Sequence, residues 1–406
     1  MEILVLNSGS SSLKFQLIET SPEQIEADSD RVRARGVVEK IGSGEAIISI
    51  EAGGKKTKTS EEVLEHRDAV HIAASCLQSS GDLEQDQIEG VGHRIVHGGE
   101  QFTQSVLIDD EVLQHIQEAI ELAPLHNPHN LKGYLAAREM LPRAKHAAVF
   151  DTSFHQTLPR HAFLYGLPYV FYDRLRVRRY GFHGTSHRYV AYRYARLFGK
   201  TRRDYKLITC HLGNGCSVCA IDHGRSVDTS MGFTPLEGLL MGTRAGDVDP
   251  AAVLHVMAKE ELTLHEVSSL LNKHSGLYGL SGISNDMRQL IEQSEKGNDR
   301  ARAAIDVFCY RVKKYIGAYL ATLNGADAVL FTGGIGENAP SVRAQICDGL
   351  DSLGIVLDPA KNKAAQGEIC RISSDDSACQ VWVIPTNEEL LIARDTLRCI
   401  LGLPHP

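Results

Sequence analysis

Nine short clusters along the 406-residue chain contain histidine, arginine, asparagine or aspartate, and five of the nine also contain glycine. These residue types bind phosphate, carboxylate and metal ions, because they supply charge, forked hydrogen bonds or oxygen ligands. The clusters are GHRIVHGG (92–99), APLHNPHN (123–130), FDTSFH (150–155), YGFHGTSHR (180–188), HLGNG (211–215), MGTRAGDVDP (241–250), NDMR (285–288), TGGIGEN (332–338) and PTNEE (385–389). One such cluster would be an ordinary turn, but nine predict a large site for a polar ligand.

A run of small residues, SGSSS at 8–12, separates the apolar stretch ILVL (3–6) from Lys14. A β-hairpin needs only two turn residues, whereas a longer run of small residues lets a bulky ligand approach the backbone. The alternative is a polar hairpin at the surface.

The same plan occurs twice in the chain, in ILVLNSGSSSLKFQL (3–17) and in ITCHLGNGCSVCAI (208–221). Two strand-turn-strand units, one in each half, indicate two similar domains that face each other across a cleft. Each turn would then present backbone amides to the same phosphate chain.

Strand and helix patterns alternate, which predicts an α/β protein, and the length favours two domains. Strands are expected at 3–6, 147–150, 207–211, 218–221 and 328–332. Residues 299–323 carry apolar side chains at steps of three and four and end at Asn324-Gly325, which predicts a long helix. Residues 42–60 are expected to form a hairpin rather than a linker.

The net charge of −8 arises from interspersed signs, which argues against binding to nucleic acid or to a membrane surface. The N-terminal MEILVLNSG is not typical of a signal peptide, and no apolar run is long enough to span a bilayer. Nine scattered cysteines suit a reducing compartment. We therefore expect a cytoplasmic protein.

Three motifs resemble known binding or redox signatures but are not expected to serve those functions. Gly199-Lys200-Thr201 looks like the end of a P-loop, but Tyr194 stands where the loop requires glycine. Residues 334–339, GIGENA, fit a dinucleotide pattern but lie too late in the chain to open a Rossmann domain. Cys216 and Cys219 form a C-x-x-C inside the apolar run CSVCAI, so we expect inert strand thiols rather than a redox pair or half a zinc site.

The motifs together resemble those of the acetate kinases. The matching segments are the N-terminal N-x-G-S-S-S-x-K, HRIVHGG, FDTSFH, YGFHGTSH, HLGNG, MGTRAGDVDP, GGIGEN and TNEEL, in the family's order, from residue 3 to about residue 396. The resemblance implies the actin-like ATPase fold of the actin, Hsp70 and sugar-kinase superfamily: two domains built on a duplicated βββαβαβα unit, with a cleft between them. We expect residues 1–150 and 385–406 to form one domain and residues 151–384 the other.

The resemblance implies a reversible transfer of phosphate from ATP to acetate, giving acetyl phosphate and ADP, by a homodimer. Asn7 and Glu388 would help to hold Mg²⁺ through water, which suits a cation that keeps much of its hydration shell, and Mn²⁺ would substitute for it. Lys14 would offer a point charge to the phosphates, with Ser10 and Ser12 beside them. The alternative for Lys14 is a solvated strand lysine.

The acceptor side is assigned by the same resemblance. Arg94 and Arg244 match two arginines that bind carboxylate or phosphoryl oxygens, although either could be half of a structural ion pair with a carboxylate such as Asp247. Phe182 and Pro235, with Leu236, match the small apolar pocket for the acceptor.

Three further residues match catalytic positions. His183 and His126 match active-site histidines, the first of which stabilises charge in the transition state; a core histidine is the alternative for each. Asp151 is described in the family as a proton donor or acceptor. Because the acceptor carboxylate is already ionised at neutral pH, we expect Asp151 to orient Arg94 or other polar groups instead.

The nucleotide side is also assigned by resemblance, as a set of residues in three of the clusters, where glycines let adenosine lie against the backbone. They are His211, Leu212, Gly213, Asn214, Gly215, Asp286, Met287, Arg288, Gly333, Gly334, Ile335, Gly336, Glu337 and Asn338. A propionate kinase of the same family is the nearest alternative, and butyrate kinases fit less well. A non-catalytic actin-like module would have no use for Arg94, His126 and His183.

Overall fold

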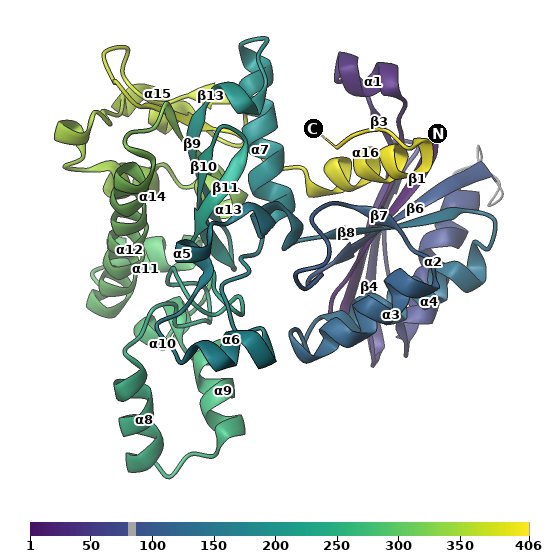
Figure 1. Cartoon of the computed structure of the whole chain (residues 1–406), viewed down its shortest axis with the longest axis horizontal. Coiled ribbons are helices and arrows are strands. Elements are labelled where there is room, and N and C mark those ends of the chain that lie inside the picture. The colour runs from purple at the N-terminus through teal and green to yellow at the C-terminus, as the bar shows by residue number, and fades with distance from the viewer. Residues whose placement is uncertain (80–86, 406) are drawn as a thin grey trace. The chain divides into compact units, whose positions relative to one another are not determined.

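The computed structural model describes residues 1–79 and 87–405, which divide into two compact units (Figure 1). The first unit is Met1–Gln156 with Asn387–Pro406, and the second is Thr157–Thr386. The first boundary falls after residue 156 rather than 150, so Asp151 lies in the first unit. The physical reason is that Asp151 continues an inner strand of that unit's sheet and bonds through its backbone N–H to Ile95 O.

The first unit is built on an eight-stranded sheet in the order β5-β4-β3-β2-β1-β6-β8-β7. The strands are β1 (Glu2–Ser8), β2 (Ser12–Glu19), β3 (Arg31–Glu39), β4 (Ser43–Ala52), β5 (Lys55–Val63), β6 (Ile88–Ile95), β7 (Val106–Leu107) and β8 (Lys145–Phe150). The helices are α1 (Pro22–Ala27), α2 (His66–Ser79), α3 (Asp110–Glu118), α4 (Asn127–Met140) and α16 (Glu388–Leu401). Strands β1, β6 and β8 run parallel, and the hairpins β1 to β5 are antiparallel.

Both faces of the central strand β1 are covered. Leu4 and Leu6 pack with residues of α2 and α4, whereas Ile3 and Val5 pack with Ile392 and its neighbours on α16. A strand covered on both sides has to be apolar throughout, as ILVL is. Helix α16, from the C-terminal end of the chain, thus covers one face of this sheet (Figure 1).

The second unit contains a six-stranded sheet in the order β11-β10-β9-β12-β14-β13. The strands are β9 (Lys206–Leu212), β10 (Cys216–Asp222), β11 (Arg225–Thr229), β12 (Ala328–Thr332), β13 (Cys370–Arg371) and β14 (Gln380–Val383). The helices are α5 (Arg160–Phe163), α6 (Tyr169–Leu175), α7 (Gly184–Leu197), α8 (Pro250–Lys259), α9 (Leu264–Lys273), α10 (Gly276–Ser281), α11 (Met287–Glu295), α12 (Asp299–Leu323), α13 (Gly333–Asn338), α14 (Pro340–Cys347) and α15 (Pro359–Ala364).

The two sheets repeat one plan. The order β3-β2-β1-β6-β8 in the first unit matches β11-β10-β9-β12-β14 in the second. In each, the first three strands are antiparallel and the last three are parallel. In both opening hairpins three residues separate the two strands, 9–11 and 213–215. The last register pairs are Ser8–Leu13 and Leu212–Cys216. The predicted duplication is therefore confirmed.

The expected elements are also confirmed. Helix α12 spans Asp299–Leu323, with the Asn298 side chain capping its start and Asn324 in the left-handed region at φ 52° closing its end. Residues 42–60 lie in the hairpin β4–β5, which turns at Gly53 and Gly54 with φ of 56° and 75°. Positive φ explains the two glycines, because residues with a Cβ adopt it at a cost.

The cysteines of the C-x-x-C motif lie on β10, as expected. Burial raises the pKa of the Cys216 thiol to about 12 and raises that of Cys219 as well. Thiols that resist ionisation are poor nucleophiles and poor metal ligands. In the described part of the chain, no helix is long and apolar enough to cross a membrane.

Candidate active site

In the first unit, Arg94 and Asp151 form a two-pronged ion pair. Arg94 lies on β6 opposite Val149 of β8, and Asp151 follows the end of β8. The Nε of Arg94 donates to Oδ1 of Asp151 at 3.0 Å, and Nη2 donates to Oδ2. The Asp151 side chain is only 1% exposed, so the pair fixes the direction of the guanidinium.

Three carboxylates, those of Asp151, Glu388 and Glu389, act on the charge of Arg94. Burial by itself lowers the pKa of Arg94, but the carboxylates of Asp151, Glu388 and Glu389 outweigh it and raise the pKa above its ordinary value. Burial is also the largest cause of the raised pKa of Glu389, to which Glu388 adds. Arg94 is therefore a permanent cation whose charge is largely neutralised within the protein.

Both predicted magnesium ligands interact with this cation. The Asn7 side-chain Oδ1 accepts from Arg94 Nη1 at 3.2 Å, and Glu388 occupies the first turn of α16. Amide and carboxylate oxygens fit Mg²⁺, which keeps several waters and needs few protein ligands. Within residues 1–79 and 87–405, no group of three or more histidine, cysteine or acidic side chains could hold a metal.

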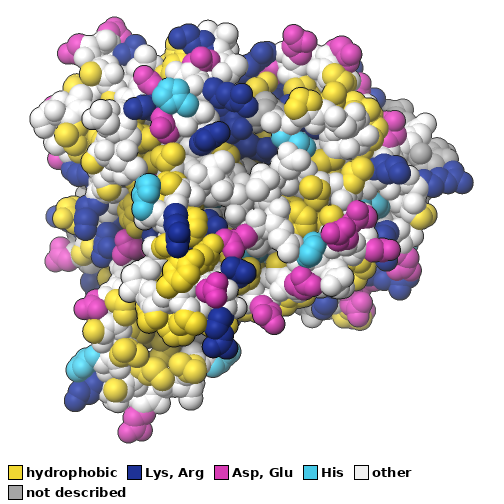
Figure 2. All heavy atoms as spheres, viewed as in Figure 1, with side chains coloured by type: hydrophobic (Ala, Val, Ile, Leu, Met, Phe, Trp, Pro, Cys, Tyr) yellow, Lys and Arg dark blue, Asp and Glu magenta, His cyan; other side chains and the backbone are white. Residues whose placement is uncertain are grey.

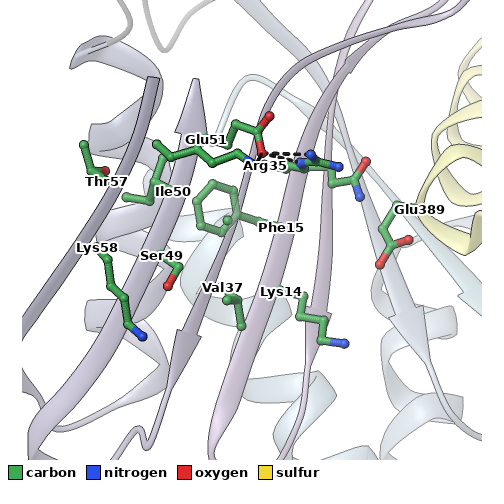
Figure 3. A pocket seen from close by; sticks show the side chains of 13 residues that line it. Lys14, Phe15, Arg35, Val37, Ser49, Ile50, Glu51, Thr57, Lys58 and Glu389 are labelled. Carbon is green, nitrogen blue, oxygen red and sulfur yellow. Dashed lines mark hydrogen bonds and ion pairs between the residues drawn. The ribbon is translucent and has the colours of Figure 1, made fainter. Parts of the chain in front are cut away.

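Lys14 lies on β2 opposite Asn7 and is exposed. It lines a groove of about 470 Å³ on the open face of strands β2 to β5, and Glu389 lines the same groove (Figure 3). Lys14 also acts electrostatically on Glu389. It is therefore coupled to the acidic residues around Arg94 rather than isolated in solvent.

Two asparagines that the sequence analysis did not single out fix the loops of this part. Asn130 on α4 accepts from Val96 N at 3.0 Å and donates to Ser8 O at 2.7 Å. Asn127 bonds to both the N–H and the carbonyl of His97. Their spacing of one helical turn, within the polar cluster at 123–130, was the available signal. His126 immediately precedes them and is the exposed N-cap of α4. Ser10 is exposed in the turn of the first hairpin, where Gly9 N donates to Ser12 O.

In the second unit, Arg244 and His183 converge over Gly215. A Cβ added to Gly215 would lie 2.6 Å from Arg244 Nη2 and 3.4 Å from both Cε1 and Nε2 of His183. Glycine in the turn therefore gives the guanidinium and the imidazole room beside the backbone. Figure 1 shows the turn between β9 and β10, at the end of the sheet.

His183 is held by a chain of polar contacts. Its Nδ1 is hydrogen-bonded to Ser217 Oγ at 2.9 Å, and the same Oγ is bonded to His187 Nε2 at 2.8 Å. His211 lies beside it with ring centroids 4.2 Å apart. His183 itself has φ of 56° before α7, a conformation that non-glycine residues adopt at a cost. The ring is thus aimed by both its backbone and its neighbours.

Arg244 differs from Arg94 in having no carboxylate to balance it. Its Nη1 donates to Pro235 O at 2.6 Å, and no acidic side chain of the described residues forms an ion pair with it. Asp247, the alternative partner, instead accepts from Gly238 N and Tyr315 Oη. Because burial is not offset by an anion, the pKa of Arg244 falls below its ordinary value. The site therefore favours an anionic ligand beside Arg244.

A pocket of about 690 Å³ lies in the same unit, at the expected nucleotide side. Predicted residues that line it are Gly213, Asn214, Asp286, Met287, Arg288, Gly334, Ile335 and Asn338. Asn285, Ile291 and Ala339–Ser341 also line it and were not predicted as site residues. The pocket has room for a large polar ligand, because typical small-molecule pockets measure about 300 to 1,000 Å³.

The remaining nucleotide-side residues support the pocket from behind. Glu337 accepts from Gly333 N at 2.9 Å and from Thr386 N at 3.2 Å, which fixes the turn after β12. Gly333, with φ of 76°, touches the backbone of Leu212, which is fully buried. Gly336 also packs against β9. Phe182 is 3% exposed, and Pro235 contributes the carbonyl that holds Arg244.

The profile of the Acetokinase family matches residues 2–394. The chain belongs to the acetokinase family. It is 55% identical to the acetate kinase of Solibacter usitatus over the full length of both chains, and 52% identical to that of Chloroherpeton thalassium over 99% of both. Among solved structures, acetate kinase from Porphyromonas gingivalis has 43% identity and a TM-score of 0.92, covering 98% of this chain and 99% of its own. A propionate kinase from Francisella tularensis has 39% identity and a TM-score of 0.90, covering 99% and 100%.

The pocket of this acetokinase-family chain can be tested at Gly334. A Cβ added there meets no atom within 4 Å, so we expect Gly334→Val to fold normally while its side chain occupies the pocket. ATP affinity should fall by about tenfold or more, corresponding to at least about 1.4 kcal/mol. Isothermal titration with ATP and a thermal melt measure the two effects.

Gly317 provides the matched control, because it is a helical glycine on α12 with equally open space around its α-carbon. Gly317→Val should bind ATP like the unchanged protein. Unaltered ATP affinity in a folded Gly334→Val variant would contradict the assignment of this pocket.

Proposed function

We propose that this chain catalyses the reversible transfer of the γ-phosphoryl group of ATP to acetate, giving acetyl phosphate and ADP. The family membership over nearly the whole chain supports the reaction, and one structural observation carries the chemistry. That observation is the uncompensated cation Arg244, beside His183 over Gly215. Phosphoryl transfer needs positioned positive charge more than it needs covalent chemistry.

Arg244 and His183 are proposed to stabilise the phosphoryl group in flight. An arginine fork can bind two phosphoryl oxygens at once. A site whose cation has no protein anion can offer its full charge to the transition state, where charge stabilisation accelerates the step. Direct in-line transfer is the mechanism that we propose, since acetate can attack phosphorus with its own ionised oxygen.

Arg94 is proposed to hold the acceptor carboxylate, with Asp151 as its orienting partner. The forked ion pair leaves Nη1 directed to Asn7 and fixes the guanidinium plane. A carboxylate in contact with a permanent arginine cation is stabilised in its ionised form and makes a weak proton donor. This contact supports orientation rather than proton transfer as the role of Asp151. His126 is proposed as a further residue of the acceptor side.

ATP is proposed to bind the pocket lined by Gly213, Asp286 and Gly334, with Lys14, Ser10 and Ser12 contacting phosphates. Asn7 and Glu388 would hold Mg²⁺ through water, and Mn²⁺ would substitute. The ion would neutralise phosphate charge. We propose that the residue sets of the two units serve this one reaction.

Propionate is the alternative acceptor. The Francisella tularensis relative is a propionate kinase by its description, at 39% identity. A pocket formed by Phe182, Pro235 and Leu236 would discriminate only weakly, because one methylene is worth about 1 to 3 kcal/mol. Turnover with formate, acetate, propionate and butyrate, with the acyl phosphate trapped by hydroxylamine, decides between them; acetate should have the highest kcat/KM.

The protein is further proposed to act in the cytoplasm as a homodimer. Exposed apolar side chains gather over α8 and α9 (Figure 2), including Leu254 at 65% and Leu264 at 79% exposure. Contiguous exposed apolar surface is typical of protein interfaces. This surface supports an association of two copies.

The kinetic test separates chemistry from binding. Arg244→Ala and His183→Ala should lower kcat by about 10²- to 10³-fold while changing KM for acetate little, because only interactions stronger in the transition state accelerate the step. Arg94→Ala should chiefly raise KM for acetate. Arg244→Lys should recover little activity, since an ammonium lacks the fork.

Steady-state kinetics with both substrates varied measure these effects, and circular dichroism checks each fold. Near-normal kcat in both Arg244→Ala and His183→Ala would show that the transition-state assignment is wrong.

The dimer can be tested at the apolar surface. Leu254→Glu with Leu264→Glu should convert the protein to monomers, because two charges would have to be buried at the interface. Light scattering after gel filtration measures the mass. A monomeric unchanged protein, or a variant that remains dimeric, would contradict the proposed dimer or its surface, respectively.

A further inference from the structure

We infer that Glu237 is a positioning residue for Arg244, acting with Arg179 and Tyr165 as a clamp on the segment that carries Pro235. The inference rests on the role proposed above for Arg244. It extends that role from the guanidinium to the residues that set its place.

Arg179 forms the base of the clamp. Its Nη1 donates to three successive carbonyls, of Thr229, Ser230 and Met231, each at 3.1 Å. Its Nη2 donates to Glu237 Oε1 at 2.5 Å. Burial by itself lowers the pKa of Arg179, but Glu237 together with Tyr165 and Tyr319 outweighs it and raises the pKa, so the guanidinium stays charged. One cation thus ties the end of β11 to Glu237.

Tyr165 closes the clamp from the other side. Its hydroxyl donates to Glu237 Oε2 at 2.5 Å and accepts from Phe233 N at 2.8 Å. Burial, with Glu237 adding to it, raises the pKa of Tyr165, so the hydroxyl remains a donor. Both oxygens of Glu237 are therefore engaged, and the backbone is held at 229–231 by Arg179 and at Phe233 by Tyr165.

Gly232 lets this clamp form. A Cβ at Gly232 would overlap the Glu237 carboxylate and the Tyr165 hydroxyl. The turn between Phe233 and Glu237 contains Pro235, whose carbonyl accepts from Arg244 Nη1 at 2.6 Å. The place of that carbonyl, and with it the direction of the guanidinium, is therefore fixed by the two ends of the clamp.

The clamp also explains why Arg244 has no carboxylate partner. Glu237 lies only two residues from Pro235, but its charge is balanced by Arg179. Asp247, three residues after Arg244, is likewise engaged with Gly238 N and Tyr315 Oη. Arg244 is thus positioned by a neutral carbonyl, which leaves its charge for an anionic ligand.

The test is a double-mutant cycle with Glu237→Gln and Arg244→Ala. We expect Glu237→Gln alone to lower kcat/KM for acetate by about 10- to 100-fold, because a displaced catalytic group costs activity steeply. KM for ATP should change less than about twofold. In the Arg244→Ala background, adding Glu237→Gln should cost less than about twofold, since residues that act through one another are not additive.

Tyr165→Phe provides a second variant that keeps the ion pair, and it should show the same split at smaller size. Tyr194→Phe is its matched control, because Tyr194 is 2% exposed and its hydroxyl contacts Gln380 at 3.3 Å, away from the clamp. Both tyrosine variants lose a hydrogen-bonded hydroxyl, so both should melt at slightly lower temperature. Only Tyr165→Phe should alter acetate kinetics.

The outcomes separate this inference from the proposed function. Normal acetate kinetics in folded Glu237→Gln and Tyr165→Phe, beside an impaired Arg244→Ala, would overturn the positioning role alone. A Glu237→Gln effect of equal size in both backgrounds would overturn it too. A fully active Arg244→Ala would overturn the role proposed for Arg244, and the positioning inference with it.

Discussion

The candidate site depends on how positive charge is balanced inside the protein. Removing a guanidinium from water is costly unless an anion or hydrogen bonds replace the lost hydration. Arg94 meets this constraint with Asp151, whereas Arg244 meets it only in part, through the carbonyl of Pro235. A cation that the protein leaves partly unbalanced is a place where a phosphoryl group or a carboxylate is stabilised on arrival.

The duplicated sheet explains how such groups are brought to strand ends. In each unit an antiparallel hairpin with a three-residue turn opens the sheet, and parallel strands follow beside it. Parallel strands that point the same way deliver the residues after them to one edge. Asp151 follows β8 in the first unit and Gly333 follows β12 in the second, each at such an edge. One architectural rule therefore serves both residue sets.

Much of the fold was predictable because it depends on local patterns. The 25-residue helix α12 follows directly from its apolar spacing and its Asn324-Gly325 end. The strand 328–332 is fully buried and is apolar up to Thr332, and its limits were also predicted correctly. The domain membership of Asp151 was not predictable in this way, because it depends on pairing with Ile95, which lies far away in the sequence.

The candidate site was likewise predictable only where it depends on local motifs. Gly334 and Asp286 can be recognised as site residues because they belong to sequence motifs. A motif does not say, however, which of its residues face a pocket. Glu337, for example, bonds to Gly333 N and Thr386 N instead of lining the pocket. The clamp of Glu237, Arg179 and Tyr165 joins residues up to 72 positions apart, and no spacing in the sequence indicates it.

The central claim is that Arg94 is balanced within the protein and that Arg244 is not. Comparing the free energy of unfolding of Arg94→Met and Arg244→Met, without ligands, tests it most directly. Arg94→Met leaves Asp151 buried without its cation and should lose about 3 kcal/mol, whereas Arg244→Met should lose nothing or gain up to about 1 kcal/mol, because methionine needs no anion. A loss of stability in Arg244→Met as large as that in Arg94→Met would contradict the account.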